Sequence, residues 1–133
     1  MSTATNKALV RRWHEEVWKG SQTIFDEVLA PDCVLHGIGG PQDIQAAITS
    51  FLGAFPDARL TIDEMITEAD KVVTRWTVQA THQGEWMGIA PTGKPITYTC
   101  IAINRIAGGK IVEDRFEADS YGLMQQLGAI PMT

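Results

Sequence analysis

The arrangement of apolar residues changes near Pro56-Asp57, and this change constrains the fold more than any other feature. Before it, apolar residues recur about every three or four positions, which is typical of helices that pack through one face. After it, strand-like segments are separated by polar or glycine-containing turns. Helices followed by a run of strands indicate an α+β layer architecture.

The first part of the chain predicts three helices and one short strand. The first helix spans about Thr5 to Lys19 and ends at Gly20, because glycine tolerates the left-handed conformation of a helix cap. The other expected elements are a helix over Ser21–Leu29, a strand over Cys33–His36 and a helix over Gln42–Phe55.

The second part predicts an antiparallel meander with a terminal helical turn. The expected elements are strands at Arg59–Ala69, Lys71–Gln83, Pro95–Ala107 and Lys110–Asp119, then a helical turn over Gly122–Leu127. The right-handed twist of strands curls such a sheet, and helices can cover its concave side. We therefore expect a single α+β domain over residues 1–133, with N-terminal helices packed on a curled antiparallel sheet that forms a cone around an internal pocket.

Composition and charge narrow the class of protein. The net charge of −5 and the scattered Lys and Arg residues argue against a nucleic-acid partner. No apolar run reaches the roughly 20 residues of a membrane-spanning helix, and the polar start of the sequence lacks the apolar stretch of a signal peptide. We therefore expect a cytoplasmic protein with no membrane partner.

The cysteines and histidines predict no metal site. Cys33 and Cys100 lie in apolar, strand-like contexts and are expected to be buried thiols. The histidines stand far apart, so no group of His, Cys, Asp and Glu has the spacing of metal ligands.

The last expected strand carries the first candidate for catalysis, Asp119. Residues on a strand alternate between faces, so Asp119 shares one face with Glu113, Arg115 and Glu117, while Val112, Phe116 and Ala118 share the other. An acid at the open end of a strand could face a cavity and act as a general acid or base. Alternatively, Asp119 caps the following helix, and a bulge near the strand end would decide between these orientations.

Several segments together resemble the SnoaL-like polyketide cyclases, a family within the nuclear-transport-factor-like cone folds. The segments are Trp13–Gly20, Leu29–His36, Ala54–Asp57, Val73–Thr77, Thr81–Glu85, Gly88–Lys94 and Gly108–Gly128. They follow one another in order over nearly the whole chain. The resemblance implies a cone fold, a hydrophobic pocket, a homodimer or higher homo-oligomer, and acid-base chemistry without a cofactor.

The resemblance also implies a reaction and a role for Asp119. In such a cyclase an aspartate removes a proton from a carbon flanked by carbonyl groups, and the resulting enolate attacks another carbonyl of the same substrate. The expected substrate is a hydrophobic, polyketide-like carbonyl compound or ester. An apolar pocket raises the pKa of the carboxylate and makes it a stronger base.

The histidines divide into candidate pocket residues and a surface residue. His82 precedes Gly84 at the expected mouth of the cone and could protonate the carbonyl under attack, or it could anchor the loop. His36 precedes a glycine-rich loop and could line the pocket or serve a structural role. His14 lies beside Glu15 in the first helix and is expected to be solvated.

Further candidates could bind the substrate. Arg75 could bind a substrate oxygen or form an ion pair with Glu113 or Glu117, and Trp86 could cover a flat ligand or form a dimer contact. The expected substrate-binding residues are His36, Arg75, Trp86, Met87, Tyr98, Arg115 and Glu117.

Two other classes of function remain open from the sequence. Isomerases, dehydratases and epoxide hydrolases are built on similar cones, and an epoxide hydrolase would need several polar groups to activate water. Cone folds also serve as non-catalytic ligand-binding or assembly modules. In the family pattern the last strand carries tryptophan near Arg115 and at Ala118, so this chain departs from it beside Asp119.

Overall fold

The computed structural model describes residues 2–131, which form four helices and five strands. In chain order they are α1 (Thr3–Val17), α2 (Ile24–Val28), β1 (Leu29–His36), α3 (Pro41–Ala54), β2 (Arg59–Glu68), β3 (Lys71–Thr81), β4 (Pro95–Ala107), β5 (Lys110–Ala118) and α4 (Ser120–Gln126). The predicted α+β class and the helix-then-strand order are confirmed.

The strands form one curled, open sheet in the order β1-β5-β4-β3-β2. The meander from β2 to β5 is antiparallel as predicted, but β1 pairs with β5 in parallel, so the sheet is mixed. The difference arises because the meander pairs only strands that follow one another and leaves one side of β5 free. The early strand β1 covers that edge, which the local pattern of the sequence does not reveal.

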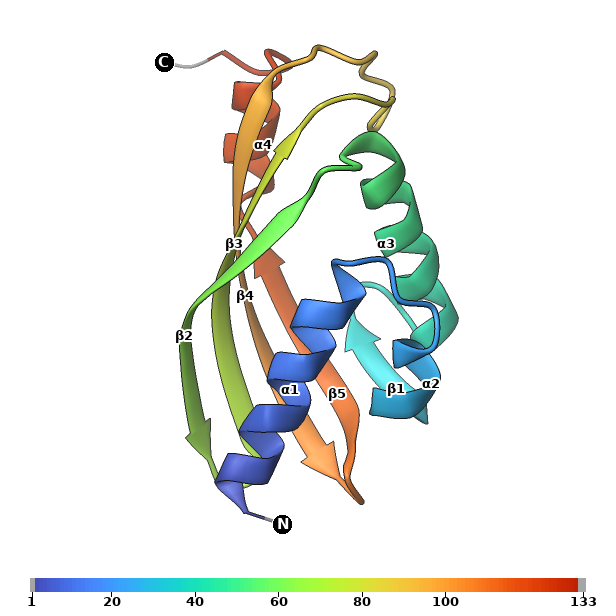
Figure 1. Ribbon diagram of the computed structural model, residues 1–133, viewed down its shortest axis with the longest axis vertical. Coiled ribbons are helices and arrows are strands. Elements are labelled where there is room, and N and C mark those ends of the chain that lie inside the picture. Colours follow the sequence, from blue (N-terminus) through green and yellow to red (C-terminus); the bar gives the residue numbers. More distant parts are fainter. Residues whose placement is uncertain (1, 132–133) are drawn as a thin grey trace.

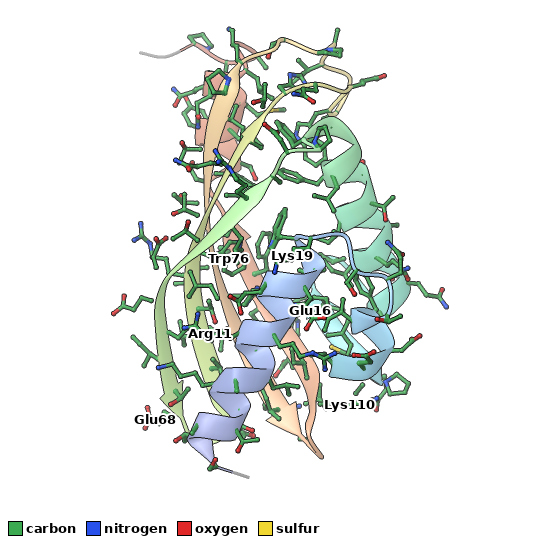
Figure 2. The ribbon with its side chains drawn as sticks, in the orientation of Figure 1. Arg11, Glu16, Lys19, Glu68, Trp76 and Lys110 are labelled. Carbon is green, nitrogen blue, oxygen red and sulfur yellow. The ribbon has the colours of Figure 1, made fainter. Side chains whose placement is uncertain are left out.

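The helices α1, α2 and α3 lie on one side of the sheet, whereas α4 lies at the end where β5 finishes (Figure 1). Side chains fill the layer between sheet and helices, with Trp76 in this layer and Glu68 at the far end of β2 (Figure 2). Along β3 and β4, buried and more exposed residues alternate, so one face of the sheet meets the helices and the other is open.

Local signals account for the ends of α1. The side chain of Ser2 accepts a hydrogen bond of 3.0 Å from the Thr5 N–H, so the helix begins slightly earlier than predicted. Gly20 has φ of +84° after the end of the helix, in agreement with its predicted role.

Within residues 2–131, no helix is long and apolar enough to cross a membrane.

A β-bulge near the start of β5 sets the orientation of the rest of that strand. Ile106 pairs with Ile111 but Arg105 pairs with Glu113, so Val112 is the extra residue. The bulge therefore lies near the start of β5, far from Asp119. Beyond it, Asp114 is buried on the helix-covered face, while Arg115 is exposed on the other.

Candidate functional site

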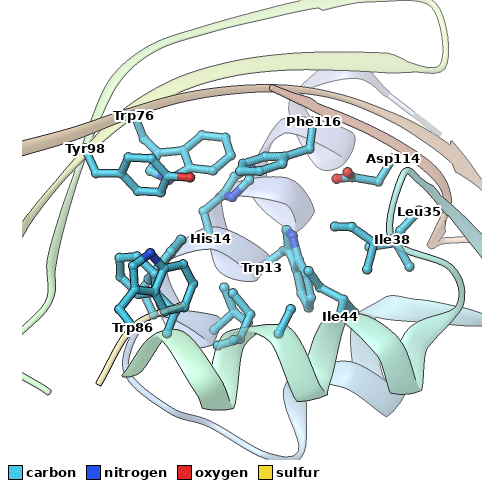
Figure 3. A pocket seen from close by; sticks show the side chains of 15 residues that line it. Trp13, His14, Leu35, Ile38, Ile44, Trp76, Trp86, Tyr98, Asp114 and Phe116 are labelled. Atoms are coloured by element: carbon cyan, nitrogen blue, oxygen red, sulfur yellow. The ribbon is translucent and has the colours of Figure 1, made fainter. Parts of the chain in front are cut away.

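A cavity of about 140 Å³ lies between the sheet, α1 and α3 (Figure 3). Its wall is mainly aliphatic and aromatic. The lining residues are Trp13, His14, Val17, Trp18, Leu35, Ile38, Ile44, Ala47, Ile48, Phe51, Trp76, Trp86, Tyr98, Asp114 and Phe116. The predicted internal pocket is therefore present, and it is walled by helices on one side and by strands on the other.

Helical spacing explains the helix side of the cavity. In α1, Val17 follows Trp13 by four positions and His14 by three, and in α3 Ile48 and Phe51 follow Ile44 by four and seven. Residues three or four positions apart share one helix face, so each helix presents a continuous apolar stripe. Ring contacts complete the wall, with Phe51 stacked on Tyr98 at a centroid distance of 5.6 Å.

Among the described residues that line the cavity, Asp114 carries the only carboxylate. It is 5% exposed, and the side-chain amide of Asn104 donates a hydrogen bond of 2.6 Å to Asp114 Oδ2. Burial raises the pKa of Asp114 to about 6, and the hydrogen bond from Asn104 partly opposes this rise. The carboxylate thus changes its protonation state near neutral pH while facing an apolar space (Figure 3).

His14 also lines the cavity, and its predicted solvated position is wrong. The residue is 2% exposed, and its ring lies against Trp76 at a centroid distance of 4.2 Å. Burial lowers the pKa of His14 to about 3, so the imidazole is neutral at physiological pH. The flanking acid Glu15 does face solvent, whereas the helix turns His14 toward the sheet.

Two of the predicted substrate-binding residues, Trp86 and Tyr98, lie at the cavity. Trp86 is half-buried in the loop after β3 and contacts Phe51 edge-on at a centroid distance of 5.2 Å. The hydroxyl of Tyr98 lies 3.3 Å from Ser120 Oγ, and burial raises the pKa of this phenol. Trp86 therefore lies at one end of the cavity (Figure 3).

Asp119 lies outside the cavity, so the expected inward orientation needs correction. Its side chain is exposed and accepts a hydrogen bond of 2.8 Å from the Gly122 N–H at the start of α4. This geometry is the capping alternative. The reason is that side chains of β5 alternate between the two faces up to the end of the strand, so Asp119 points outward like Glu117 and Arg115.

His82 is buried but does not line the cavity. Its Nδ1 accepts a hydrogen bond of 3.2 Å from the Thr92 N–H, and its backbone N–H donates to the Lys94 carbonyl at 2.9 Å. The ring also stacks on Phe55 at a centroid distance of 5.3 Å. These contacts tie both ends of the loop between β3 and β4 together, which is the loop-anchoring alternative for His82.

His36 and Arg115 belong to a charged cluster away from the cavity. His36 Nε2 lies 2.6 Å from Glu113 Oε2, and Arg105 and Arg115 contact the same carboxylate at 3.2 and 3.4 Å. These partners hold the pKa of Glu113 below its usual value, with the hydrogen bond to His36 as the largest cause. The cluster lies on the open face because the side chains of Glu113 and Arg115 point outward from β5.

The remaining predicted substrate-binding residues also lie outside the cavity. Arg75 and Glu117 line a shallow depression on the open face of the sheet, together with Asp119. Among residues 2–131, Arg75 forms no ion pair with Glu113 or Glu117. Met87 is 73% exposed at the tip of the loop.

The cysteines behave as predicted, and no metal centre is formed by the described residues. Cys33 and Cys100 are buried, and burial raises the pKa of their thiols to about 11 and about 12. Residues 2–131 contain no cluster of three or more His, Cys, Asp or Glu side chains that could hold a metal ion.

Two sequence signals could have identified the residues that were missed. Asp114 lies on the same face of the last strand as Phe116 and Ala118. This face is apolar, and a carboxylate on such a face is unusual. His14 lies four positions after Val10 and three before Val17, so it falls within the buried stripe of α1.

A sequence model of the SnoaL-like polyketide cyclase family matches residues 8–127. The chain therefore belongs to this family. No curated protein matches the sequence.

Solved structures agree with this assignment. AclR from Streptomyces galilaeus, named as a proposed hydroxylase, is 31% identical, with a TM-score of 0.90 over 98% of this chain and 89% of its own. TsrD from Streptomyces laurentii is 27% identical, with a TM-score of 0.88 over 98% and 99%. IdmH from Streptomyces antibioticus, named as a proposed polyketide cyclase, is 26% identical, with a TM-score of 0.84 over 92% and 98%. The names of AclR and IdmH are those of enzymes, and they differ in the reaction.

Proposed function

We propose that this protein is an enzyme that binds a hydrophobic carbonyl compound in the cavity and catalyses an aldol-type cyclisation through Asp114. The observation that carries the proposal is a single buried carboxylate in an apolar cavity, with a pKa of about 6. A general base works best when its pKa lies near the working pH, because it is then both deprotonated and basic. This role replaces the one first considered for Asp119.

The reaction requires proton transfers only. Asp114 takes a proton from a carbon next to a carbonyl group, and the electron pair of the C–H bond becomes an enolate. The enolate carbon then attacks a second carbonyl of the same molecule, and the new alkoxide takes up one proton, so that the proton removed by Asp114 is returned and the carboxylate is regenerated. Substrate and product are isomers, so the residues present meet the demands of this step without a redox partner or cofactor.

The cavity supports the proposal by its size and walls. An engineered apolar cavity of about 150 Å³ is known to hold benzene, so a space of about 140 Å³ can seat one ring of a substrate. Aromatic side chains from the sheet and from α3 face this space and would hold a flat ring in one orientation. A fixed orientation brings the reacting carbons together and removes part of the entropic barrier.

A double-bond isomerase is the alternative that the same geometry favours, because it also needs one buried carboxylate to move a proton. An epoxide hydrolase receives less support. The described residues that line the cavity include no arginine and only one acid, whereas that chemistry needs several polar groups to activate water.

The test measures deuterium exchange from solvent into the C–H next to the carbonyl of aryl ketones and aryl 1,3-diketones. We expect exchange to rise with pH around an apparent pKa near 6, and to fall about 100-fold or more in Asp114→Asn. Asp119→Asn is the matched control and should exchange like the unaltered protein.

Each outcome of this experiment has a distinct meaning. Equal exchange in Asp114→Asn and the unaltered protein would remove Asp114 as the base. Binding without any exchange would identify a binding module, and absence of binding would reject the cavity as the site. The products formed from a substrate with two carbonyl groups would separate cyclase from isomerase.

We also propose that the open face of the sheet packs against a second copy of the chain. Ile66, Ile101 and Ile103 are 56%, 43% and 40% exposed, and Ile66 and Ile103 line a depression that also contains Arg105 and Glu113. Apolar residues bordered by charges of both signs can be self-complementary across a two-fold axis. Light scattering should show a dimer that Ile103→Lys dissociates. The control Glu15→Lys on α1 should leave the dimer intact, and a monomeric unaltered protein at high concentration would reject the proposal.

A further inference from the structure

Two buried ring nitrogens at the cavity have no hydrogen-bond partner among the described residues. They are His14 Nε2 and Trp76 Nε1. His14 and Trp76 are each 2% exposed, both line the cavity, and their ring centroids are 4.2 Å apart. The two rings that carry these nitrogens therefore lie side by side in the wall of the cavity (Figure 3).

Two other polar groups of the cavity do have partners. Asp114 receives a hydrogen bond from Asn104, and the Tyr98 hydroxyl lies within hydrogen-bond distance of Ser120 Oγ. Buried polar groups are nearly always paired, and an unpaired one calls for an explanation. A ligand with a suitable polar atom would supply the missing partner.

The chemistry of the two nitrogens selects the kind of atom that they can bind. An indole Nε1–H can only donate a hydrogen bond. The imidazole of His14 is neutral, so it carries a single N–H, and in the Nε2–H tautomer it also donates. Two donors on adjacent rings match one oxygen with two lone pairs, and a ketone oxygen has this property.

We infer that His14 and Trp76 form the binding site for the carbonyl oxygen of the ligand, and that the ligand is a flat, ring-sized ketone. This inference rests on the proposed function of the cavity. When Asp114 removes a proton from the neighbouring carbon, negative charge develops on that oxygen. Preorganised donors stabilise such a charge more strongly in an apolar site than in water. His14 and Trp76 would thus serve both ligand selection and the reaction.

The experiment compares two probes that differ in the carbonyl group, acetophenone and ethylbenzene. Their dissociation constants are measured by calorimetry or NMR for the whole chain and for His14→Phe and Trp76→Phe, which keep an aromatic ring but lose the ring nitrogen. Trp18→Phe is the matched control, because Trp18 also lines the cavity but its nitrogen is not among the fully buried atoms that lack a partner. Circular dichroism and thermal melting establish that each variant is folded.

We expect the preference for acetophenone over ethylbenzene to fall about 10-fold in each of His14→Phe and Trp76→Phe. The affinity for ethylbenzene should stay within about twofold, and Trp18→Phe should keep the original preference. If both probes bind and the preference is the same in all proteins, the inference is overturned while binding in the cavity stands. If neither probe binds the unaltered protein, the proposed function fails and this inference fails with it.

Discussion

Replacing the buried carboxylate by an amide should stabilise this protein in a pH-dependent way. In Asp114→Asn the new side chain has nearly the same size and can still accept the hydrogen bond from the Asn104 amide. Its own amide can in addition donate to Asn104 Oδ1, which is buried and has no partner among the described residues. The substitution therefore removes a buried charge without creating a cavity or an unpaired group.

The magnitude follows from the pKa of Asp114. Burial raises this pKa from 3.8 to about 6, so the folded state binds a proton more tightly than the unfolded state. Between these two values the folded chain carries more protons, and the contribution of Asp114 to stability decreases as pH rises. Above about pH 6 the accumulated cost is about 3 kcal/mol, and below pH 3.8 it vanishes because both states are protonated.

The assay is denaturation by urea at constant ionic strength between about pH 3.5 and about pH 8, a range that brackets both ends of the titration. The free energy of unfolding of Asp114→Asn should exceed that of the unaltered protein by up to about 3 kcal/mol at pH 7, and this gain should shrink below pH 6. Taking the difference between the proteins cancels the titration of all other groups. A gain that is independent of pH, or one that grows toward acid, would refute the reasoning.

Three further predictions concern neighbouring groups. Asn104→Leu should raise the pKa of Asp114 above about 6, because it removes the hydrogen bond that favours the charged form. A ¹³C NMR titration measures this pKa, and a lower value would contradict the prediction. The contribution of His14 to stability should decrease as pH falls from 6.5 toward about 3, because the unfolded state takes up a proton that the buried ring does not. In urea denaturation, the stability of the unaltered protein relative to His14→Gln should therefore fall over this range, and a pH-independent difference would speak against it. Asp119→Ala should cost about 1 kcal/mol of stability in urea denaturation because the α4 cap is lost, whereas Asp119→Asn should keep the cap and the stability. A change in ligand affinity in either variant would conflict with a purely capping role.

The sequence alone determined the elements that depend on local signals. The strand Pro95–Ala107 has the predicted bounds, and α3 differs by one residue at each end, because periodicity and turn residues act within a few positions. The end of the first helix at Gly20 and the burial of both cysteines follow for the same reason. The similarity of several ordered segments to one family added the cone fold and its internal pocket.

Only the tertiary structure decided which side chains meet in that pocket. A strand has two faces and a helix has many, and the packing of distant elements determines which of them is buried. Thus Asp114 faces the cavity and Asp119 caps a helix, although both acids lie in the same short segment. His14 turns inward and stacks on Trp76, a residue 62 positions away in sequence, because α1 lies across the sheet. Local spacing can indicate that His14 and Asp114 are buried, but it does not encode which distant residues they meet, because those contacts arise from the folded arrangement of the chain.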